Sequence, residues 1–264
     1  MIELRTLGAV DLRDRDGREL RAVLAQPKRL ALLVYLAVAR PRGFHRRDTL
    51  LALFWPELEQ GRARAALRKA VLVVRQGLDP AGRGGREGEA LVGRGDEELG
   101  LAEGAVSCDA AAFDRAIDER RFGDALDLYQ GDLLAGFFIT GAPEFERWVE
   151  RERARFREQA AGAAWALAEE SAAPGRDVLA VKWARRALDF TPTDESALRR
   201  LIRLFYRLGD RAAALRAYDD FAARLLEEEG VRPSAETRQL VQVMKRSGQL
   251  PTIREGEPRE RGQR

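Results

Sequence analysis

The sequence has one cysteine, Cys108, and one histidine, His45, among its 264 residues. A single cysteine cannot form a disulfide within the chain, and zinc sites are usually built from several cysteine and histidine ligands. These absences exclude a disulfide framework and argue against a Cys/His metal site. We expect Cys108, between Ser107 and Asp109, to be a small and chemically silent residue. His45 is expected to form a hydrogen bond near the start of a helix.

Long apolar runs and enzyme motifs are also missing. No stretch approaches the roughly 18 to 20 consecutive apolar residues of a membrane-spanning helix, and the start, MIELRTLGAV, lacks the basic and apolar regions of a signal peptide. We therefore expect a cytoplasmic protein without a membrane partner. The sequence contains neither a nucleotide-binding glycine motif nor GxSxG, so catalysis would depend on scattered carboxylates. It predicts no enzyme, no cofactor and no metal site.

The sequence does have a cluster of positive charge. Residues 27–79 contain eleven Arg and Lys against four Asp and Glu, a net charge of +7, whereas residues 109–249 contain 23 against 25, a net charge of −2. A general preference for arginine would explain Arg in place of Lys, but it would not explain the clustering. A basic segment in an otherwise balanced chain indicates a polyanion partner for that segment.

The first hundred or so residues are typical of a small α+β unit. Short strands are expected within 1–26, with a turn at 14–17 between VDLR and RELRAV. A Gly-rich loop at 79–89 leads into a hairpin formed by ALVG and ELGLAE around RGDE. Between the strands and this loop, apolar residues recur every three or four positions and predict helices at about 28–38, 46–54 and 62–78.

From residue 109 onward the composition is typical of helices rich in Ala, Leu and Arg. We expect them at about 109–121, 123–130, 143–173, 176–190, 194–208, 210–229 and 234–246. Gly175 and Gly209 lie 34 residues apart, and each is followed five residues later by an alanine. This spacing is typical of tetratricopeptide repeats, which stack into a continuous core with a concave groove.

The arginines, the aromatic residues and the C-terminal tail of this region are interpreted as structural features and not as binding sites. Five arginines between residues 147 and 157 alternate with glutamates and predict a solvated helix face. Residues 250–264 have almost no apolar content and predict a disordered tail or linker. The aromatic residues occur at helical spacing, which is more typical of a core than of a ligand groove: Trp148, Trp165, Trp183, Phe205, Tyr206, Tyr218 and Phe221.

The basic helix predicted at 62–78 has two distinct sides. At 100° per residue, six apolar residues fall within one arc of about 100°: Ala63, Leu67, Ala70, Val71, Val74 and Leu78. The opposite side carries cations along both of its edges: Arg64, Arg68 and Arg75 on one, Arg62 and Lys69 on the other. Gly61 and Ala65 lie between these edges. Small residues flanked by cations allow close approach to a phosphate-lined groove.

The neighbouring elements make this helix a candidate for DNA recognition. A short helix, a turn at Trp55 and Pro56 and the longer basic helix predict a helix-turn-helix, with the hairpin as a wing. Acidic residues follow Arg94 in the hairpin and would be repelled by DNA. We expect Arg64 and Arg68 to contact base edges, and Arg46, Arg47 and Arg75 to contact phosphates. Arg94 would contact a minor groove or a phosphate. Arg62 and Lys69 complete the set of cations that face the DNA.

Several stretches resemble a known family. QPKRLALLVYLAV, RRDTLLALFWPE, ARAALRKAVLVVRQGL and CDAAAF resemble, in this order, the OmpR-type winged helix of the antibiotic regulatory proteins of actinobacteria. ALDLYQGDLLAGF, FERWVERERARFREQ and residues 187–237 resemble the bacterial transcriptional activator domain. The resemblance implies a mainly α protein with a winged helix-turn-helix domain at 1–106 and an all-α tetratricopeptide-like domain at 107–249, followed by the tail.

This resemblance implies a transcriptional regulator that binds double-stranded promoter DNA. Its helical repeats would serve protein contacts or signal input, with RNA polymerase or another regulatory protein as the candidate partner. Leu72 and Val73 depart from the family pattern, which usually has polar or basic residues there. They favour an alternative, a tetratricopeptide-type interaction scaffold whose winged helix is structural or dimerising. The operator, the input signal, the direction of regulation and the formation of a homodimer are left open.

Overall fold

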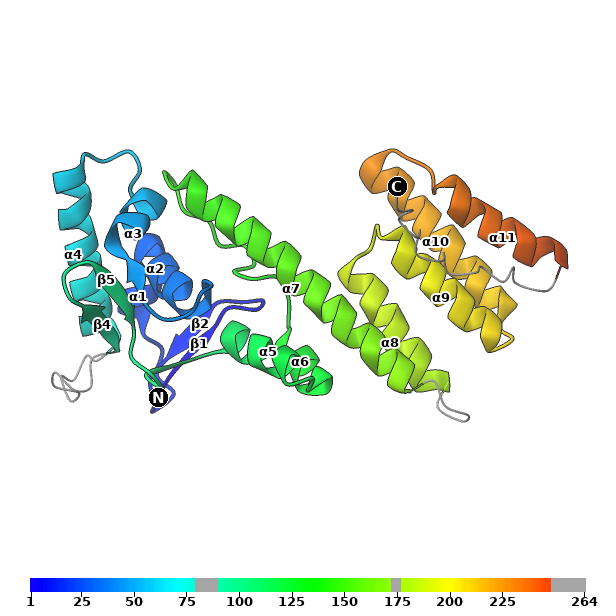
Figure 1. Cartoon of the computed structure of the whole chain (residues 1–264), viewed down its shortest axis with the longest axis horizontal. Helices are drawn as coiled ribbons and strands as arrows, with labels where there is room; N and C mark the ends of the chain where they lie inside the picture. Colours follow the sequence, from blue (N-terminus) through cyan, green and yellow to red (C-terminus); the bar gives the residue numbers. More distant parts are fainter. Residues whose placement is uncertain (79–89, 172–176, 248–264) are drawn as a thin grey trace, which may run out of the picture. The chain divides into compact units, whose positions relative to one another are not determined.

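The structure, a computed structural model, describes residues 1–78, 90–171 and 177–247 (Figure 1). The chain forms two compact units, Met1–Ala163 and Ala164–Arg264. The first unit contains two three-stranded sheets and several helices, and the described part of the second is helical. The prediction of a mainly α protein, with an α+β part followed by helices, is confirmed. The loop predicted at 79–89 and the tail predicted at 250–264 lie outside the described residues.

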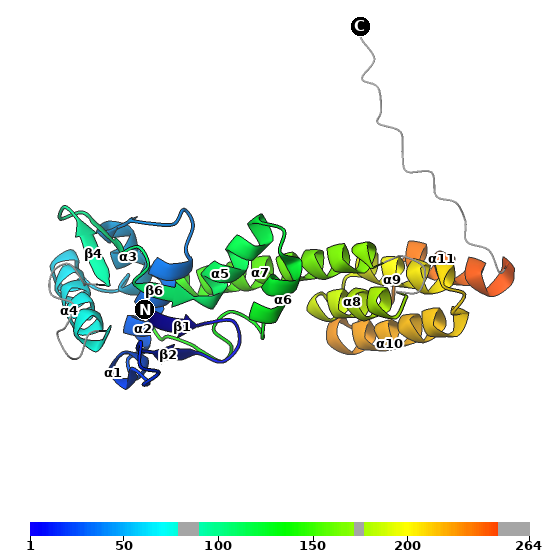
Figure 2. The same ribbon diagram turned by 90° about the horizontal axis from the view of Figure 1, so that it is seen from below.

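The N-terminal sheet joins the start of the chain to a strand far along the sequence. β1 (Ile2–Arg5) pairs antiparallel with β2 (Asp11–Arg13) and parallel with β6 (Val106–Cys108). Figure 2 shows β1 and β2 side by side. The turn predicted at 14–17 is confirmed, because the amide of Gly17 donates to the carbonyl oxygen of Asp14 at 3.0 Å.

The strand predicted for RELRAV is wrong beyond a single bridge. An isolated pairing joins Arg13 to Glu19, and the chain then enters α1 (Arg21–Leu24). The buried residues here are Leu20 and Val23, three positions apart. This spacing places both side chains on one face of a helical turn but on opposite faces of a strand.

Three helices and a hairpin pack together next to this sheet. They are α2 (Pro27–Val38), α3 (Arg47–Phe54), α4 (Gln60–Leu78), β4 (Leu91–Arg94) and β5 (Glu98–Leu101), which Figure 1 shows as one group. Pro27 occupies the first helical position of α2, where an amide proton has no helical partner. All six residues of the apolar arc predicted for α4 are buried. The predicted helices and hairpin are therefore confirmed.

Helix α4 approaches α1 so closely that Gly77 has no room for a side chain. A Cβ atom at Gly77 would lie 2.5 Å from Cγ2 of Val23, which is fully buried. We expect Gly77→Ala to lower the free energy of unfolding by about 1–2 kcal/mol, because overpacking outweighs the gain in helix propensity. Gly61→Ala is the matched control, since no atom lies within 4 Å of its added Cβ. Urea denaturation of both variants measures the difference, and equal effects would contradict this contact.

The remaining helices agree with the predicted ranges to within a few residues. α5 (Asp109–Asp118), α6 (Phe122–Leu128) and α7 (Pro143–Glu170) follow β6, and α8 (Asp177–Phe190), α9 (Glu195–Arg207), α10 (Arg211–Glu229) and α11 (Ala235–Ser247) lie in the second unit. Helix α9 packs against α8, α10 and α11. The carboxylates of Asp194 and Asp210 accept amide hydrogen bonds at the starts of α9 and α10, which fixes where both helices begin.

The aromatic residues predicted to form a core are mostly buried. Trp148, Trp165, Phe205 and Phe221 are buried, whereas Trp183, Tyr206 and Tyr218 are half-buried. The core interpretation is confirmed for the first four residues. In the first unit, Phe113 of α5 contacts Phe156 of α7 with 5.4 Å between ring centroids.

The solvated arginine face predicted on α7 is wrong for three of its members. Arg153 donates to the carbonyl oxygens of Leu133 and Leu134, Arg155 pairs with Asp114, and Arg157 pairs with Asp132. The reason is the packing of α7 against α5 and against the chain segment that precedes it. These arginines therefore join elements of the first unit to one another.

The carboxylate of Asp114 pairs with three arginines and forms the centre of a buried ion-pair cluster. It is fully buried and lies 2.9 Å from Nη2 of Arg40, 2.8 Å from Nη2 of Arg42 and 2.7 Å from Nη1 of Arg155. Burial raises the pKa of Asp114, but hydrogen bonds and charge from Arg155, Arg40 and Arg42 outweigh it and hold the pKa below its usual value. The cluster joins the segment after α2 to α5 and α7.

Candidate nucleic-acid interface

A hollow of about 470 Å³ opens between the start of α3, the first half of α4 and the turn of the β4–β5 hairpin. Its walls carry four arginines from two separate segments of the chain, together with three acidic and two apolar side chains: Arg46, Arg47, Asp48, Leu51, Arg64, Leu67, Arg68, Asp96 and Glu97. Half of the cations predicted to bind DNA therefore meet at one place on the first unit.

A short strand that the sequence did not reveal joins the segment of Arg46 and Arg47 to the hairpin. β3 (His45–Arg46) precedes α3 directly and pairs antiparallel with β5, with Arg46 opposite Glu98. The amide of Arg47 also donates to the carbonyl oxygen of Glu97 at 2.7 Å. These backbone bonds place the first turn of α3 beside the hairpin, so Arg46 and Arg47 reach the same hollow as the arginines of α4.

Arg47 occupies a confined position at this junction. Its side chain is half-buried, and its Nε atom has no hydrogen-bond partner within the described residues. Gly93 on β4 lies beside it, since a Cβ atom there would be in ordinary contact with Nη2 of Arg47 at 3.7 Å. A buried guanidinium nitrogen without an acceptor is costly, and an anion bound in the hollow would supply one.

The cations on the outer side of α4 point away from its core. Arg62, Arg64, Arg68 and Lys69 are all exposed, and none of them forms an ion pair or side-chain hydrogen bond with another described residue. Arg64 and Arg68 are four positions apart, so they follow one another along the helix by one turn, about 6 Å. Leu72 continues the exposed side with 55% of its surface accessible. The outer side of α4 is therefore basic in its first half and partly apolar after it.

The other two predicted cations have contacts within the protein. Nε of Arg75 donates to the carbonyl oxygen of Leu91 at 3.1 Å, which holds β4 against α4. Nε of Arg94 lies 2.5 Å from a carboxylate oxygen of Glu98, its partner across the hairpin. The hydrogen bond and charge of Glu98 raise the pKa of Arg94. Arg94 is exposed and stays accessible, but the carboxylate of Glu98 offsets its positive charge at this point of the hairpin.

The single histidine and the single cysteine are both buried. Nε2 of His45 has no hydrogen-bond partner within the described residues, so the prediction that His45 forms a hydrogen bond is wrong for Nε2. The imidazole ring packs against the ring of Tyr35, with 5.1 Å between the ring centroids. Burial lowers the pKa of His45. Burial also raises the pKa of the Cys108 thiol to about 11, which keeps it protonated at neutral pH, as expected of a chemically silent residue.

Clusters of metal-ligating side chains and membrane-spanning helices are both absent from the described residues. Among the described residues, no group of three or more His, Cys, Asp or Glu side chains is placed to hold a metal ion. None of the described helices has the length and apolar character that crossing a membrane requires.

Comparisons with known proteins identify the family. Residues 97–245 match the model of the bacterial transcriptional activator domain. A solved structure, "Mycobacterium tuberculosis EmbR in complex with low affinity phosphopeptide", is similar with a TM-score of 0.62 and 23% identity over 95% of this chain and 66% of that chain. This structural similarity shows a shared fold, and the chain spans less than two thirds of that relative's length. The comparison with curated protein sequences gave no match. Because the family model covers more than half of its residues, the chain belongs to the bacterial transcriptional activator domain family.

Proposed function

We propose that this protein is a transcriptional regulator that binds double-stranded promoter DNA through a winged helix. The DNA-binding part would comprise residues 1–106, with α3 and α4 as the helix-turn-helix and the β4–β5 hairpin as the wing. The observation that supports it best is the convergence of Arg46, Arg47, Arg64 and Arg68 on one hollow beside the exposed basic side of α4. This is the charge distribution that phosphate binding requires.

Within this proposal, α4 enters the major groove and the remaining cations hold the DNA backbone. Arg64 and Arg68 are assigned to base edges because they are exposed, unpaired within the described chain and one turn apart. Arg46 and Arg47 are assigned to phosphates at the start of α3, where the helix dipole also favours an anion. Arg62, Lys69, Arg75 and Arg94 complete the set. Asp48, Asp96 and Glu97 in the same hollow would repel a phosphate and so weaken its binding there.

The helical part, residues 107–249, would serve protein contacts or signal input. Ala180, Ala184 and Ala187 on α8 are buried, as are Ala214 and Phe221 on α10, which is the pattern of a tetratricopeptide-like repeat. Gly175, the first glycine of the predicted spacing, lies outside the described residues. RNA polymerase or another regulatory protein is the candidate partner of this part.

A salt titration tests the proposed function. The full chain is titrated into a fluorescein-labelled mixed-sequence duplex at salt concentrations between about 50 and 200 mM, with anisotropy as the signal. About five cation–phosphate contacts should give a slope of roughly −4 to −5 in a plot of log affinity against log salt. A slope near zero, or no binding at the lowest salt, would contradict the proposal.

One observation favours a second candidate function. Leu72 is 55% exposed on the outer side of the helix assigned to DNA, and packing it against a protein surface would remove this apolar side chain from water. In this alternative the protein is an interaction scaffold and α4 packs against a partner or a second copy. The same titration would then show no duplex binding, and sedimentation velocity would show self-association that Leu72→Ser removes.

A further inference from the structure

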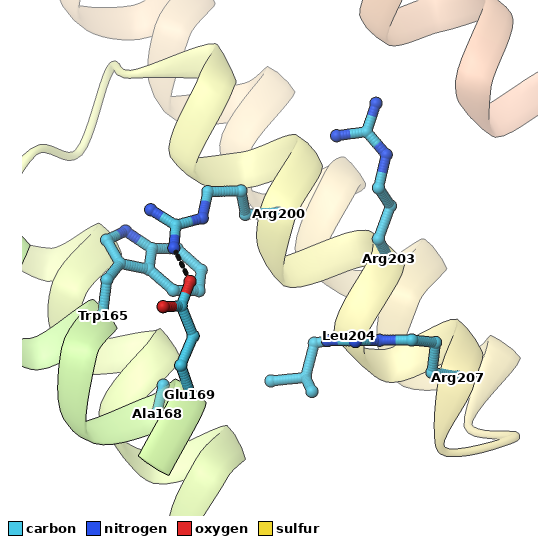
Figure 3. Close-up of a pocket in the computed structure, with 7 residues that line it drawn as sticks. All are labelled: Trp165, Ala168, Glu169, Arg200, Arg203, Leu204 and Arg207. Atoms are coloured by element: carbon cyan, nitrogen blue, oxygen red, sulfur yellow. Dashed lines mark hydrogen bonds and ion pairs between the residues drawn. The ribbon is translucent and has the colours of Figure 1, made fainter. Parts of the chain in front are cut away.

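The second unit contains a separate pocket between the last turns of α7 and helix α9. Its volume is about 310 Å³, and Trp165, Glu169, Arg200, Arg203, Leu204 and Arg207 line it (Figure 3). All of these residues belong to one compact unit. The pocket therefore does not depend on the DNA-binding elements.

The pocket combines an apolar wall with an excess of positive charge. Trp165 and Leu204 are 8% and 5% exposed, so only a small part of each reaches the pocket. Arg200 lies over the indole ring of Trp165, 4.1 Å from its centroid, and pairs with Glu169. Figure 3 shows this stack and the bond between Arg200 and Glu169. One of the three arginines is thus neutralised within the protein.

The other two arginines have no counterion. Arg203 and Arg207 form no ion pair and no side-chain hydrogen bond with another described residue. In Figure 3, Arg207 extends toward Leu204, whereas Arg203 points away from Glu169. Two uncompensated guanidinium groups beside an apolar wall favour a ligand that carries both negative charge and an apolar group.

The spacing of these arginines fits an extended peptide better than a single small anion. Arg203 and Arg207 are four positions apart on α9, a rise of about 6 Å along the helix axis. Alternate residues of an extended chain are separated by a similar distance, about 6.6–6.8 Å, and their side chains lie on the same side. The two arginine side chains start about one helical turn apart and extend in different directions (Figure 3), so two carboxylates at alternate positions of an extended chain can reach both, whereas one small anion reaches only one.

We propose that this pocket binds an extended acidic peptide segment of a protein partner. Carboxylates at alternate positions would pair with Arg203 and Arg207, and a neighbouring apolar side chain would pack on Leu204 and the edge of Trp165. This inference deepens the protein-contact role proposed above by stating the chemistry of the partner. It does not depend on whether the first unit binds DNA.

A synthetic probe tests this inference with the full chain. The probe is a short fluorescein-labelled peptide with glutamates at alternate positions around one leucine, and anisotropy reports its binding. We expect saturable binding that weakens about tenfold or more when glutamine replaces every glutamate, and severalfold when serine replaces the leucine. Equal binding of the glutamate and glutamine peptides, or no binding of either, would overturn the proposal.

Protein variants locate the binding site. Arg203→Gln combined with Arg207→Gln should weaken probe binding about tenfold. Arg216→Gln combined with Arg238→Gln makes the same change in net charge at exposed positions outside the pocket, and it should leave binding within about twofold. Equal losses in both double variants would overturn the site. If the first double variant does not fold, which circular dichroism would reveal, the peptide series on the unmodified protein still decides the question.

A nucleic-acid arm separates this proposal from the proposed function. Arg203→Gln combined with Arg207→Gln should bind duplex DNA as the unmodified protein does. Arg64→Glu combined with Arg68→Glu should bind the peptide as the unmodified protein does. If the pocket variant instead loses DNA affinity and the peptide does not bind, the pocket belongs to a nucleic-acid surface and the peptide proposal is wrong. Failure of DNA binding alone leaves the peptide result to be judged separately.

Discussion

Replacement of Asp114 by alanine is expected to lower the free energy of unfolding by about 3 kcal/mol. Removing one partner from a buried ion pair typically costs about 3–5 kcal/mol, because the remaining charge loses its counterion. The lower end applies because Arg40 and Arg42 retain 43% and 36% exposure and water would partly replace the carboxylate. The loss should be larger than that of any single surface substitution, because three guanidinium groups share this carboxylate.

Asp114 should also make the free energy of unfolding depend on pH in the acidic range. Burial raises its pKa, and Arg155, Arg40 and Arg42 more than reverse this effect, so the folded pKa is lower than the unfolded pKa. The stabilisation is therefore complete above the unfolded pKa of about 3.9 and is lost as the pH falls through the folded pKa. Asp114→Ala should remove part of this acid dependence. The rest would persist because Asp132 and Glu195 also have lowered pKa values.

A neighbouring acid on the same helix provides the control for this measurement. Asp118 is exposed at the end of α5, and Asp118→Ala should change the free energy of unfolding by no more than about 0.5 kcal/mol. Urea denaturation followed by circular dichroism, at neutral pH and at several pH values below about 3.9, compares the two variants with the unmodified protein. If both substitutions have the same small effect, the arginine cluster does not stabilise the fold.

The helices were predictable because their apolar period is local. In α4, the positions of six buried side chains follow from the sequence alone, since residues three and four apart share a face. The failure at α1 has the same origin. Helix α1 has four residues and Leu20 directly precedes it, so one pair of apolar side chains at Leu20 and Val23 is too short a pattern to distinguish a turn of helix from a strand.

The candidate site was predictable only where it depends on one helix. The exposure of Arg64 and Arg68 follows from the period of α4, but their convergence with Arg46 and Arg47 depends on β3 pairing with β5, which are distant in sequence. A strand of two residues carries no periodic signal. The hollow could therefore be found only from the tertiary structure.

The arginine cluster left a weak signal that sequence reasoning missed. Asp114 lies among the apolar residues of α5, next to Phe113 and near Ala110, and all three are buried. An acid on an apolar helix face requires a charged partner. Its partners lie on the segment after α2 and on α7, and no local spacing connects these positions. The sequence could indicate that a counterion was needed, whereas its identity depends on packing.

The DNA-facing role of α4 predicts the largest functional effect. Arg64→Glu combined with Arg68→Glu is expected to reduce affinity for duplex DNA by about a hundredfold or more near 0.1 M salt. Both arginines are assigned to base edges, and a good arginine–base contact contributes about 1–3 kcal/mol, or roughly five- to 150-fold in affinity. Two such contacts would be lost, and the two introduced carboxylates would repel the phosphate backbone. The slope of log affinity against log salt should also become shallower, because the helix face beside the phosphates would change from positive to negative.

The matched control reverses the same charge elsewhere on the first unit. Arg15 and Arg18 are exposed in the turn after β2, outside the hollow, so Arg15→Glu combined with Arg18→Glu makes the same change in net charge. If affinity depended only on the net charge of the protein, both double variants would lose it equally. At this salt concentration, charges more than about 10 Å apart are largely screened from each other. The control variant should therefore lose no more than about threefold in affinity for duplex DNA. Equal losses of affinity in the two double variants would show that α4 is not part of the DNA interface. If the unmodified protein still bound DNA with the expected dependence on salt, another basic surface would have to make the contacts.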